Sequence, residues 1–473
     1  MKVSRIAAAI AALLVAAAAI FYAAASHSPT RDVISAPAVI ADPAPMALVC
    51  SGGVTRQIED GMDVDSVDEA ISTESWIVAR GTSGTPLVVN SKGTELDTQG
   101  RLAFMHVSDA VADVYSADAS SAQQLLWAGA AVHTAAAGDL RGVATSPCIS
   151  PTNDEWLVGS QTGVGTSNAL AITNPGRNAI TVDVAAYGAA GPLEAATRSS
   201  IVVSAGETQW VSLDGALPDD ERIALHLTTE TGTFAALLQE TVLDGATPAG
   251  VTFIEPSVAE ESVVIPGVAI ASKLASSVRI VNPAQEDAAV SVSVLSDEDS
   301  IALPGATDVT VPAGTVMDLS LEGLDAGVYT LQITSNQPIT AGVKQELAEK
   351  SGTDIAWASS VAPVRAGAAV FAPGDATVAV TAVGESEAAV RVIPISADGS
   401  EGTVLRETLA PGRQAVFELP EDTVGVFVYS DNDVVAGVAI TAALPKDGGT
   451  GVDWVPVHAS QAEQASTQIV LQP

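Results

Sequence analysis

The residues of this chain that could do chemistry are five histidines, two cysteines and many carboxylates. No two histidines stand at the spacing of an H-E-x-x-H zinc site, and the cysteines do not form a C-x-x-C pair. The chain also lacks a G-x-S-x-G nucleophile elbow, an S-x-x-K motif and a Walker A phosphate loop. The histidines are His27, His106, His133, His226 and His458. We therefore expect no catalytic residue, no metal ligand and no small-molecule cofactor.

Two histidines and one glycine pair need an interpretation of their own. His226 stands in an alternating apolar stretch and His133 in an alanine-rich segment, so we interpret both as structural residues rather than catalytic bases. The stretch from Gly163 to Gly165 lacks the third glycine of a dinucleotide-binding loop and precedes a predicted strand. It is therefore interpreted as a turn.

Three acidic stretches are candidates for cation binding. Residues 60–69 read DGMDVDSVDE, in which oxygen ligands at alternate positions could hold calcium. An EF-hand loop would need Asp or Asn where Val67 stands and Gly where Asp68 stands, so a solvated acidic loop is the preferred interpretation. Residues 219–221 and 297–299 are interpreted as charged turn tips. Nothing singles out a carboxylate pair for glycoside hydrolysis.

The charge balance restricts the possible partners. The chain has 20 basic and 56 acidic residues, for a net charge of −36. Such a surface repels nucleic acid and anionic membranes, because binding to both rests on basic side chains. Solubility is one interpretation of the acidity, and attraction to cationic partners is the other.

The N-terminus has the pattern of a membrane-targeting helix. Lys2 and Arg5 precede an uncharged apolar run of 20 residues, from Ile6 to Ala25. That length can span a bilayer core, although the small residues at its end would also suit a signal peptidase. We therefore predict a signal anchor or a signal peptide at 1–25, followed by a proline-punctuated linker at 26–46. Positive charge before the span places the remainder outside the cytoplasm.

An exported chain with two cysteines is expected to contain a disulfide. Cys50 and Cys148 would close a loop of about 100 residues, which stabilises the fold by roughly 4–5 kcal/mol in the chain-entropy model. Two unrelated buried thiols are the alternative.

The main signal in the remaining sequence is repetition. An Asn-Pro turn after a strand occurs at Asn174 and Asn282, 108 residues apart. Gly206 and Gly314 are also 108 residues apart, and Gly412 follows after a further 98. A leucine lies seven residues after each glycine, and each copy closes with a strand carrying one aromatic residue. These leucines are Leu213, Leu321 and Leu419, and the aromatic residues are Phe253, Trp357 and Trp454.

A period near 100 residues, with short alternating strands, is typical of an immunoglobulin-like β-sandwich. We therefore predict an all-β chain of tandem sandwiches after the N-terminal helix. A β-propeller in which each repeat is two four-stranded blades is the alternative. The predicted units are a divergent β-rich module at 47–155, repeats at 156–262, 263–365 and 366–460, and a tail at 461–473. A short helix is expected within residues 110–126.

The motifs at Gly138–Gly142, Ser146–Cys148, Trp156–Gly159 and Thr173–Gly176 resemble a family of actinobacterial envelope proteins that carry a domain of unknown function. The resemblance covers most of the chain after residue 46. It implies export, single-pass anchoring and tandem β-modules, and it supplies no catalytic residues. The third repeat departs from the pattern because it lacks the Asn-Pro pair.

These observations predict a non-catalytic scaffold or interaction protein in the cell envelope. Its partners would be the membrane, through the N-terminal helix, and envelope proteins or cell-wall glycan. The first alternative is a carbohydrate-binding accessory protein in envelope glycan assembly, which would need exposed aromatic residues such as Trp127, Trp156 or Trp454. The second alternative is a hydrolase that uses paired carboxylates.

Overall fold

The computed structural model describes residues 13–18, 46–55, 71–81, 88–117, 125–194 and 199–459. Residues 13–18 are helical, and the other parts of the predicted leader, the linker before Met46 and the tail at 461–473 lie outside these ranges. No helix in the described ranges is long and apolar enough to cross a membrane. Residues Pro43–Ala465 form one compact unit, to which the rest of this description refers.

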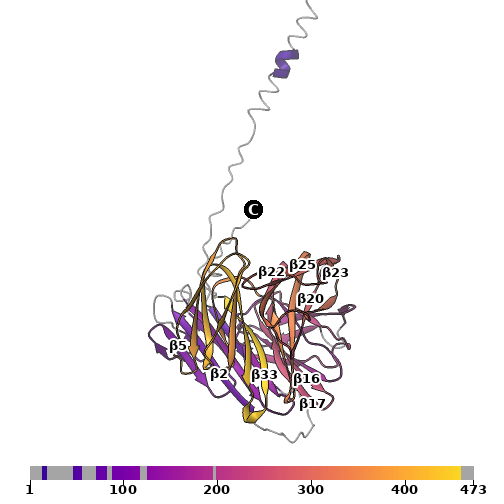
Figure 1. The fold of residues 1–473 in the computed structure, drawn as a ribbon. Helices are drawn as coiled ribbons and strands as arrows, with labels where there is room; N and C mark the ends of the chain where they lie inside the picture. Colours follow the sequence, from indigo (N-terminus) through magenta and orange to yellow (C-terminus); the bar gives the residue numbers. More distant parts are fainter. Residues whose placement is uncertain are drawn as a thin grey trace, which may run out of the picture. The chain divides into compact units, whose positions relative to one another are not determined.

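The compact unit is almost entirely β, which confirms the all-β prediction (Figure 1). Within the described residues of this compact unit, the one short helix is a 3₁₀ turn at Pro445–Asp447. Apolar and polar side chains alternate along many strands, and the apolar ones face the interior, as a pleated strand requires.

The first region contains two sheets, with strand orders β1-β6-β3 and β4-β5-β2-β7-β8. Their strands are β1 (Met46–Ser51), β2 (Ile71–Gly81), β3 (Val88–Val89), β4 (Thr98–Gln99), β5 (Leu102–Val107), β6 (Ala112–Ala117), β7 (Leu125–Ala135) and β8 (Gly142–Pro147). Of the helix expected within 110–126, the described residues 110–117 and 125–126 contain only β6, the start of β7 and the two residues before β6, and residues 118–124 lie outside the described residues. Pairing of β6 with β1 along its whole length overrides the helix propensity of its alanines.

The first repeat also contains two sheets. Their orders are β14-β10-β16-β17 and β12-β11-β15-β9-β18, and β13 also pairs with β11. The strands of the first sheet are β10 (Thr166–Thr173), β14 (Thr208–Ser212), β16 (Ala235–Asp244) and β17 (Thr247–Ile254). Those of the second are β9 (Asp154–Val158), β11 (Ile180–Gly188), β12 (Gly191–Leu193), β13 (Ser200–Val203), β15 (Ala224–Thr228) and β18 (Pro256–Ser257).

The second and third repeats have the same strand order, but in each a single long strand runs through both sheets. The first half of β25 pairs with β19 and β21, and its second half pairs with β20 and β26. The long strand β32 pairs in the same way with β27, β29, β28 and β33. Each eight-stranded sheet is therefore two sheets joined by one strand.

The strands of the second repeat are β19 (Ala259–Ile270), β20 (Leu274–Val281), β21 (Ala288–Leu295), β22 (Ser300–Ala302), β23 (Val309–Val311), β24 (Val316–Ser320), β25 (Gly327–Glu349) and β26 (Gly352–Ser359). Those of the third are β27 (Val364–Val370), β28 (Asp375–Ala382), β29 (Ala388–Ser396), β30 (Leu405–Leu409), β31 (Gln414–Glu418), β32 (Thr423–Ala443), β33 (Thr450–Pro456) and β34 (His458–Ala459).

The glycines that mark the repeats occupy equivalent turns. Gly206, Gly314 and Gly412 lie between β13 and β14, β23 and β24, and β30 and β31, with φ angles of 73°, 71° and 73°. This left-handed conformation favours glycine. The side-chain amides of Asn174 and Asn282 each donate to the carbonyl of the last residue in the strand before the glycine turn. The distances are 3.1 Å to Val203 of β13 and 3.0 Å to Val311 of β23.

The final strands of the first region and of the three repeats contact one another in a closed circle. Strand β8 contacts β17, β17 contacts β26, β26 contacts β33, and β33 contacts β8. In Figure 1 the yellow strand β33 accordingly lies among strands from other parts of the chain. We call β8, β17, β26 and β33 the inner strands.

The aromatic residue on each repeat's inner strand packs into the preceding unit. Trp357 of β26 belongs to the core of the first repeat, and Trp454 of β33 belongs to the core of the second. Phe253 of β17 packs with Val49 and Ile149 of the first region. The cores therefore depend on neighbouring units rather than being closed within one repeat.

The first region and the last repeat also pack together. Trp76 and Leu126 share a core with Phe427 of β32, and the Arg80 guanidinium lies 2.8 Å from the Glu401 carboxylate. Because the first and last units touch, the packing of sheet against sheet is continuous around the described unit.

Replacing Trp454 by Ala is expected to lower the free energy of unfolding by about 3–5 kcal/mol, the usual range for removing a buried aromatic side chain. Because the side chain links two repeats, we expect one cooperative transition that shifts as a whole in guanidinium denaturation followed by circular dichroism. Val416→Ala, at an exposed position, is the control. A separate early transition of a single repeat would show that the units are independent.

Candidate functional site

A buried carboxyl group lies between the inner strands. Asp354 of β26 accepts hydrogen bonds through Oδ2 from the backbone amides of Val143 in β8 (3.1 Å) and Val452 in β33 (3.0 Å). Its other oxygen has no hydrogen-bond partner among the described residues. Burial raises the pKa of Asp354 well above its usual range, which favours the neutral acid.

Glycines on three inner strands make room for this carboxyl group. A Cβ atom added at Gly250 would lie 2.8 Å from Asp354 Oδ1, and one at Gly451 would lie 2.7 Å from Oδ2. A Cβ atom at Gly142 would collide with the same carboxyl group. Only backbone can approach the acid this closely, so these three positions require glycine.

Two further acids are buried along the inner strands, Asp453 within β33 and Glu255 directly after β17. Glu255 follows β17, and its Oε2 lies 3.4 Å from Nε2 of His458. Burial raises the pKa of Asp453 on β33 to about 8, although the backbone amide of Trp454 donates to its Oδ1 at 2.9 Å, and the charge of Glu255 adds to the increase. Burial also raises the pKa of Glu255, and His458 opposes that increase.

These acids have the raised pKa values that catalytic groups often have, so the cavities near them matter. Cavities of about 990, 630, 550 and 490 Å³ occur in the described unit, and none is lined by Asp354, Asp453 or Glu255. No group of three or more His, Cys, Asp or Glu side chains in the described ranges could hold a metal ion. All three acids are buried against the inner strands, and burial raises the pKa of each.

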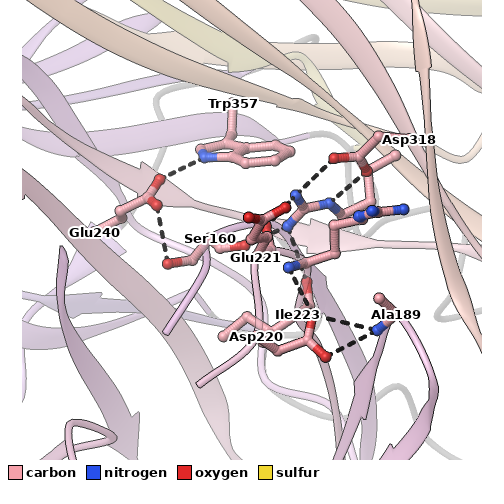
Figure 2. Close-up of polar contacts among 10 residues, drawn as sticks. Ser160, Ala189, Asp220, Glu221, Ile223, Glu240, Asp318 and Trp357 are labelled. Atoms are coloured by element: carbon pink, nitrogen blue, oxygen red, sulfur yellow. Dashed lines mark hydrogen bonds and ion pairs between the residues drawn. The ribbon is translucent and has the colours of Figure 1, made fainter. Parts of the chain in front are cut away.

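A second polar network joins the first repeat to the second (Figure 2). Arg279 of β20 binds the Asp318 carboxylate through two nitrogens, at 2.8 and 2.9 Å. The same guanidinium donates to the backbone carbonyls of Ser160, Glu221 and Ile223 in the first repeat. Asp318 neutralises a guanidinium that is otherwise held by carbonyl oxygens.

Trp357 extends this network into the core. Its indole lies 5.0 Å from the Arg279 guanidinium, and its Nε1 donates to Glu240 at 2.6 Å. Ser160 donates to the other oxygen of Glu240 at 3.0 Å and has a left-handed backbone with φ of 73°. Figure 2 shows Glu240 and Ser160 on one side of Trp357 and Asp318 on the other. The network fixes two repeats against each other and has no free acid–base pair.

Three of the histidines contact a backbone carbonyl, an aromatic ring or a carboxylate. His133 is buried, its Nε2 is 3.0 Å from the Leu140 carbonyl, and burial lowers its pKa. His226 stacks on Trp156 at 4.2 Å and contacts Asp154 at 3.0 Å. His106 pairs with Glu74 on the surface at 2.9 Å.

Two of the three acidic stretches named as cation-binding candidates lie within the described residues. Residues 60–69 lie outside the described residues. In the stretch 219–221, Asp220 accepts hydrogen bonds from the backbone amides of Ala189 and Arg222, which orders the loop. In the stretch 297–299, the amides of Glu298 and Asp299 donate to the hydroxyl of Ser296 in a turn.

The cysteines and tryptophans named by the sequence are interior residues. Cys50 and Cys148 are joined in a disulfide that ties the end of β1 to the residue after β8. Trp127, Trp156 and Trp454 are 4%, 6% and 1% exposed, so none presents an open face to a sugar ring.

Sequence reasoning did not single out Asp354, Asp453 or Glu255. Asp354 and Asp453 each stand in the closing strand of a repeat, which was the one signal available. Alternation along a strand suggests that such an aspartate faces the solvent, so the signal did not identify them as buried. Arg279 was also missed, although it stands in an apolar strand that ends in Asn-Pro.

A family model described as a family of unknown function, DUF5719, matches residues 105–420, two thirds of the chain. The chain belongs to the DUF5719 family. The DUF5719 match begins within β5 and ends before β32, so it covers parts of the first region and of the third repeat and all of the two repeats between them. The domain of unknown function is thus confirmed, and its actinobacterial origin stays a prediction.

Comparison with solved structures gives distant similarities. The crystal structure of Thermotoga maritima 1070 is 15% identical, with a TM-score of 0.20, over 22% of this chain and 93% of that one. The crystal structure of Streptomyces avermitilis α-L-rhamnosidase complexed with L-rhamnose is 9% identical, with a TM-score of 0.13, over 80% of this chain and 54% of that one. Neither score supports an argument about fold or function. No curated protein matches the chain.

Asp453→Asn is expected to reduce the pH dependence of stability. An acid with a folded pKa of about 8 stabilises the fold fully below pH 4, and this contribution is lost as pH rises towards 8. Roughly four pKa units correspond to at most about 5 kcal/mol. Urea denaturation at pH 5 and pH 8.5 should show a smaller loss in the variant than in the wild type. Asp244→Asn, at an exposed position, is the control, and an unchanged loss in Asp453→Asn would contradict the assignment.

Arg279→Lys is expected to destabilise the protein by about 3 kcal/mol although it keeps the charge, because lysine cannot reproduce the planar fork that holds Asp318 and three carbonyls. Thermal unfolding measures the loss. Arg413→Lys, at an exposed ion pair, should change stability by less than about 0.5 kcal/mol. Equal effects of the two substitutions would show that the network contributes only its charge.

Proposed function

We propose that this chain is a non-catalytic interaction protein that presents a rigid β-structured surface outside the cytoplasmic membrane. The observation that carries the proposal is the position of the acids with raised pKa values, which are sealed between inner strands instead of lining a cavity. The charged leader and apolar run support export, either as a membrane-anchored or as a secreted protein. The disulfide between Cys50 and Cys148 agrees with an oxidising compartment.

We propose a propeller-like ring for the compact unit, in which each repeat supplies two sheets. The closed circle of inner strands and the insertion of Trp357 and Trp454 into the preceding repeats favour this over independent immunoglobulin-like sandwiches. A sandwich would close its own core between its two sheets. The proposed repeat boundaries at 156, 263 and 366 each lie a few residues after the start of a strand. These strands are β9, β19 and β27, which begin at Asp154, Ala259 and Val364.

The carbohydrate-binding alternative loses its sequence-based support, because the three tryptophans that could stack on sugars are buried. The carboxylate-hydrolase alternative has the converging acids Asp453 and Glu255, but none of the four cavities reaches them. Binding through the exposed sheet edges and loops is the function that these observations leave best supported.

The test is retention of the full chain, purified in mild detergent, on immobilised envelope proteins and separately on intact cell-wall glycan. We expect a defined envelope protein to retain it. Retention on glycan alone would favour the carbohydrate-binding alternative. The chain unfolded by reduction and heating is the control, because a surface built from paired sheets must lose specific binding when the sheets separate.

A further inference from the structure

Two arginines stand side by side on the exposed face of the third repeat. Arg391 of β29 is directly opposite Arg406 of β30, and Tyr429 of β32 is opposite Arg391 on the other side. Like charges in directly opposed positions of a sheet destabilise the pairing. Their juxtaposition is notable in a chain with 20 basic and 56 acidic residues, because acidic partners are abundant.

Neither arginine has an acidic partner within the described part of the chain. The Arg391 guanidinium lies 5.2 Å from the centre of the Tyr429 ring, and Arg406 donates to the Val404 carbonyl at 3.3 Å. Arg80 contacts the same ring at 5.7 Å and donates to the Tyr429 hydroxyl at 2.9 Å. Tyr429 is therefore held by two guanidinium groups and helps to fix the position of Arg391.

The nearby acids are engaged with backbone amides. Asp431 accepts a hydrogen bond from the amide of Ala389 at 2.7 Å, and Glu407 accepts one from the amide of Thr408 at 3.4 Å. Both carboxylates keep a second oxygen for a further hydrogen bond. Among the described residues, the two arginines and the two acids thus line one surface hollow without forming ion pairs with one another.

That hollow is a cavity of about 550 Å³, lined by Arg391, Arg406, Glu407, Thr408, Ser430 and Asp431, together with Ala389 and Val390. Paired guanidinium groups hold a planar carboxylate by parallel hydrogen bonds. The carboxylates and hydroxyls of the lining suit a ligand that also offers hydroxyl donors. We propose that this cavity binds a saccharide carrying a carboxylate, that is, a uronic-acid unit of an acidic glycan.

The acidic lining separates a uronate from a phosphate ligand. A densely charged polyphosphate would be repelled by Glu407 and Asp431, whereas sugar hydroxyls donate to them. The charge of −36 on the whole chain disfavours ligands according to their charge density, which is one carboxylate per sugar unit in a uronate glycan and higher in a polyphosphate. The inference goes beyond the proposed function, because it assigns an acidic saccharide to this one cavity and does not depend on sugar stacking by the buried tryptophans.

The test is calorimetric titration of the full chain with trigalacturonate, maltotriose and tripolyphosphate. Trigalacturonate should bind, with an affinity that falls as salt is raised, and the neutral maltotriose should bind at least ten-fold more weakly. Arg391→Gln and Arg406→Gln should each weaken trigalacturonate binding at least ten-fold. Arg413→Gln makes the same charge change at another exposed site and should alter it by less than two-fold.

Four outcomes would overturn the proposal. They are no trigalacturonate binding, equal binding of tripolyphosphate, an equal loss in Arg413→Gln, and full binding in both cavity variants. Thermal unfolding of each variant checks that these exposed substitutions leave the fold intact. Retention by envelope proteins is measured separately, so a failure of saccharide binding leaves the broader binding function standing.

Discussion

The close approach of the four inner strands is the constraint on which the rest of this structure depends. At Asp354 the strands come so near that three neighbouring positions must be glycine, and the carboxyl group must bond to the backbone of two other strands. One side chain from the second repeat thereby contacts the first region and the third repeat. Burial raises the pKa of this acid and so favours its neutral form, since a buried charge without a partner would be far more costly.

The same constraint explains how a chain rich in small side chains forms a large interior. Alanine and valine bury little area each, so a repeat built from them has a thin core of its own. Insertion of Trp357 and Trp454 into the preceding repeats supplies large apolar side chains where two units meet. Arg279 then fixes one of these junctions by binding carbonyl groups across it. Stability is therefore shared between the units.

Sequence patterns predicted the strands and the marker turns well, because both depend on local chemistry. Gly206, Gly314 and Gly412 are found by spacing because each turn needs a left-handed residue. The packing between repeats could not be derived, because a period near 100 residues fits both one sandwich and two propeller blades. The alternation that identifies β25 and β32 as strands also cannot show that each crosses from one sheet to another. Asp354 and Asp453 were missed for the same reason, since a polar residue in a strand is ordinarily read as facing water.

Acidic residues on the surface and acidic residues between the inner strands have different roles in this protein. The many surface carboxylates keep a strongly negative chain soluble, while those between the inner strands act as hydrogen-bonding groups that fix strand positions. Most of the charged surface is negative, whereas Arg391 and Arg406 place two positive guanidinium groups next to each other on a rigid sheet. A rigid support lets such groups keep their spacing without a ligand, so little ordering is needed when one binds. The paired sheets that bury the acids are thus also the support that holds the two guanidinium groups at a fixed spacing.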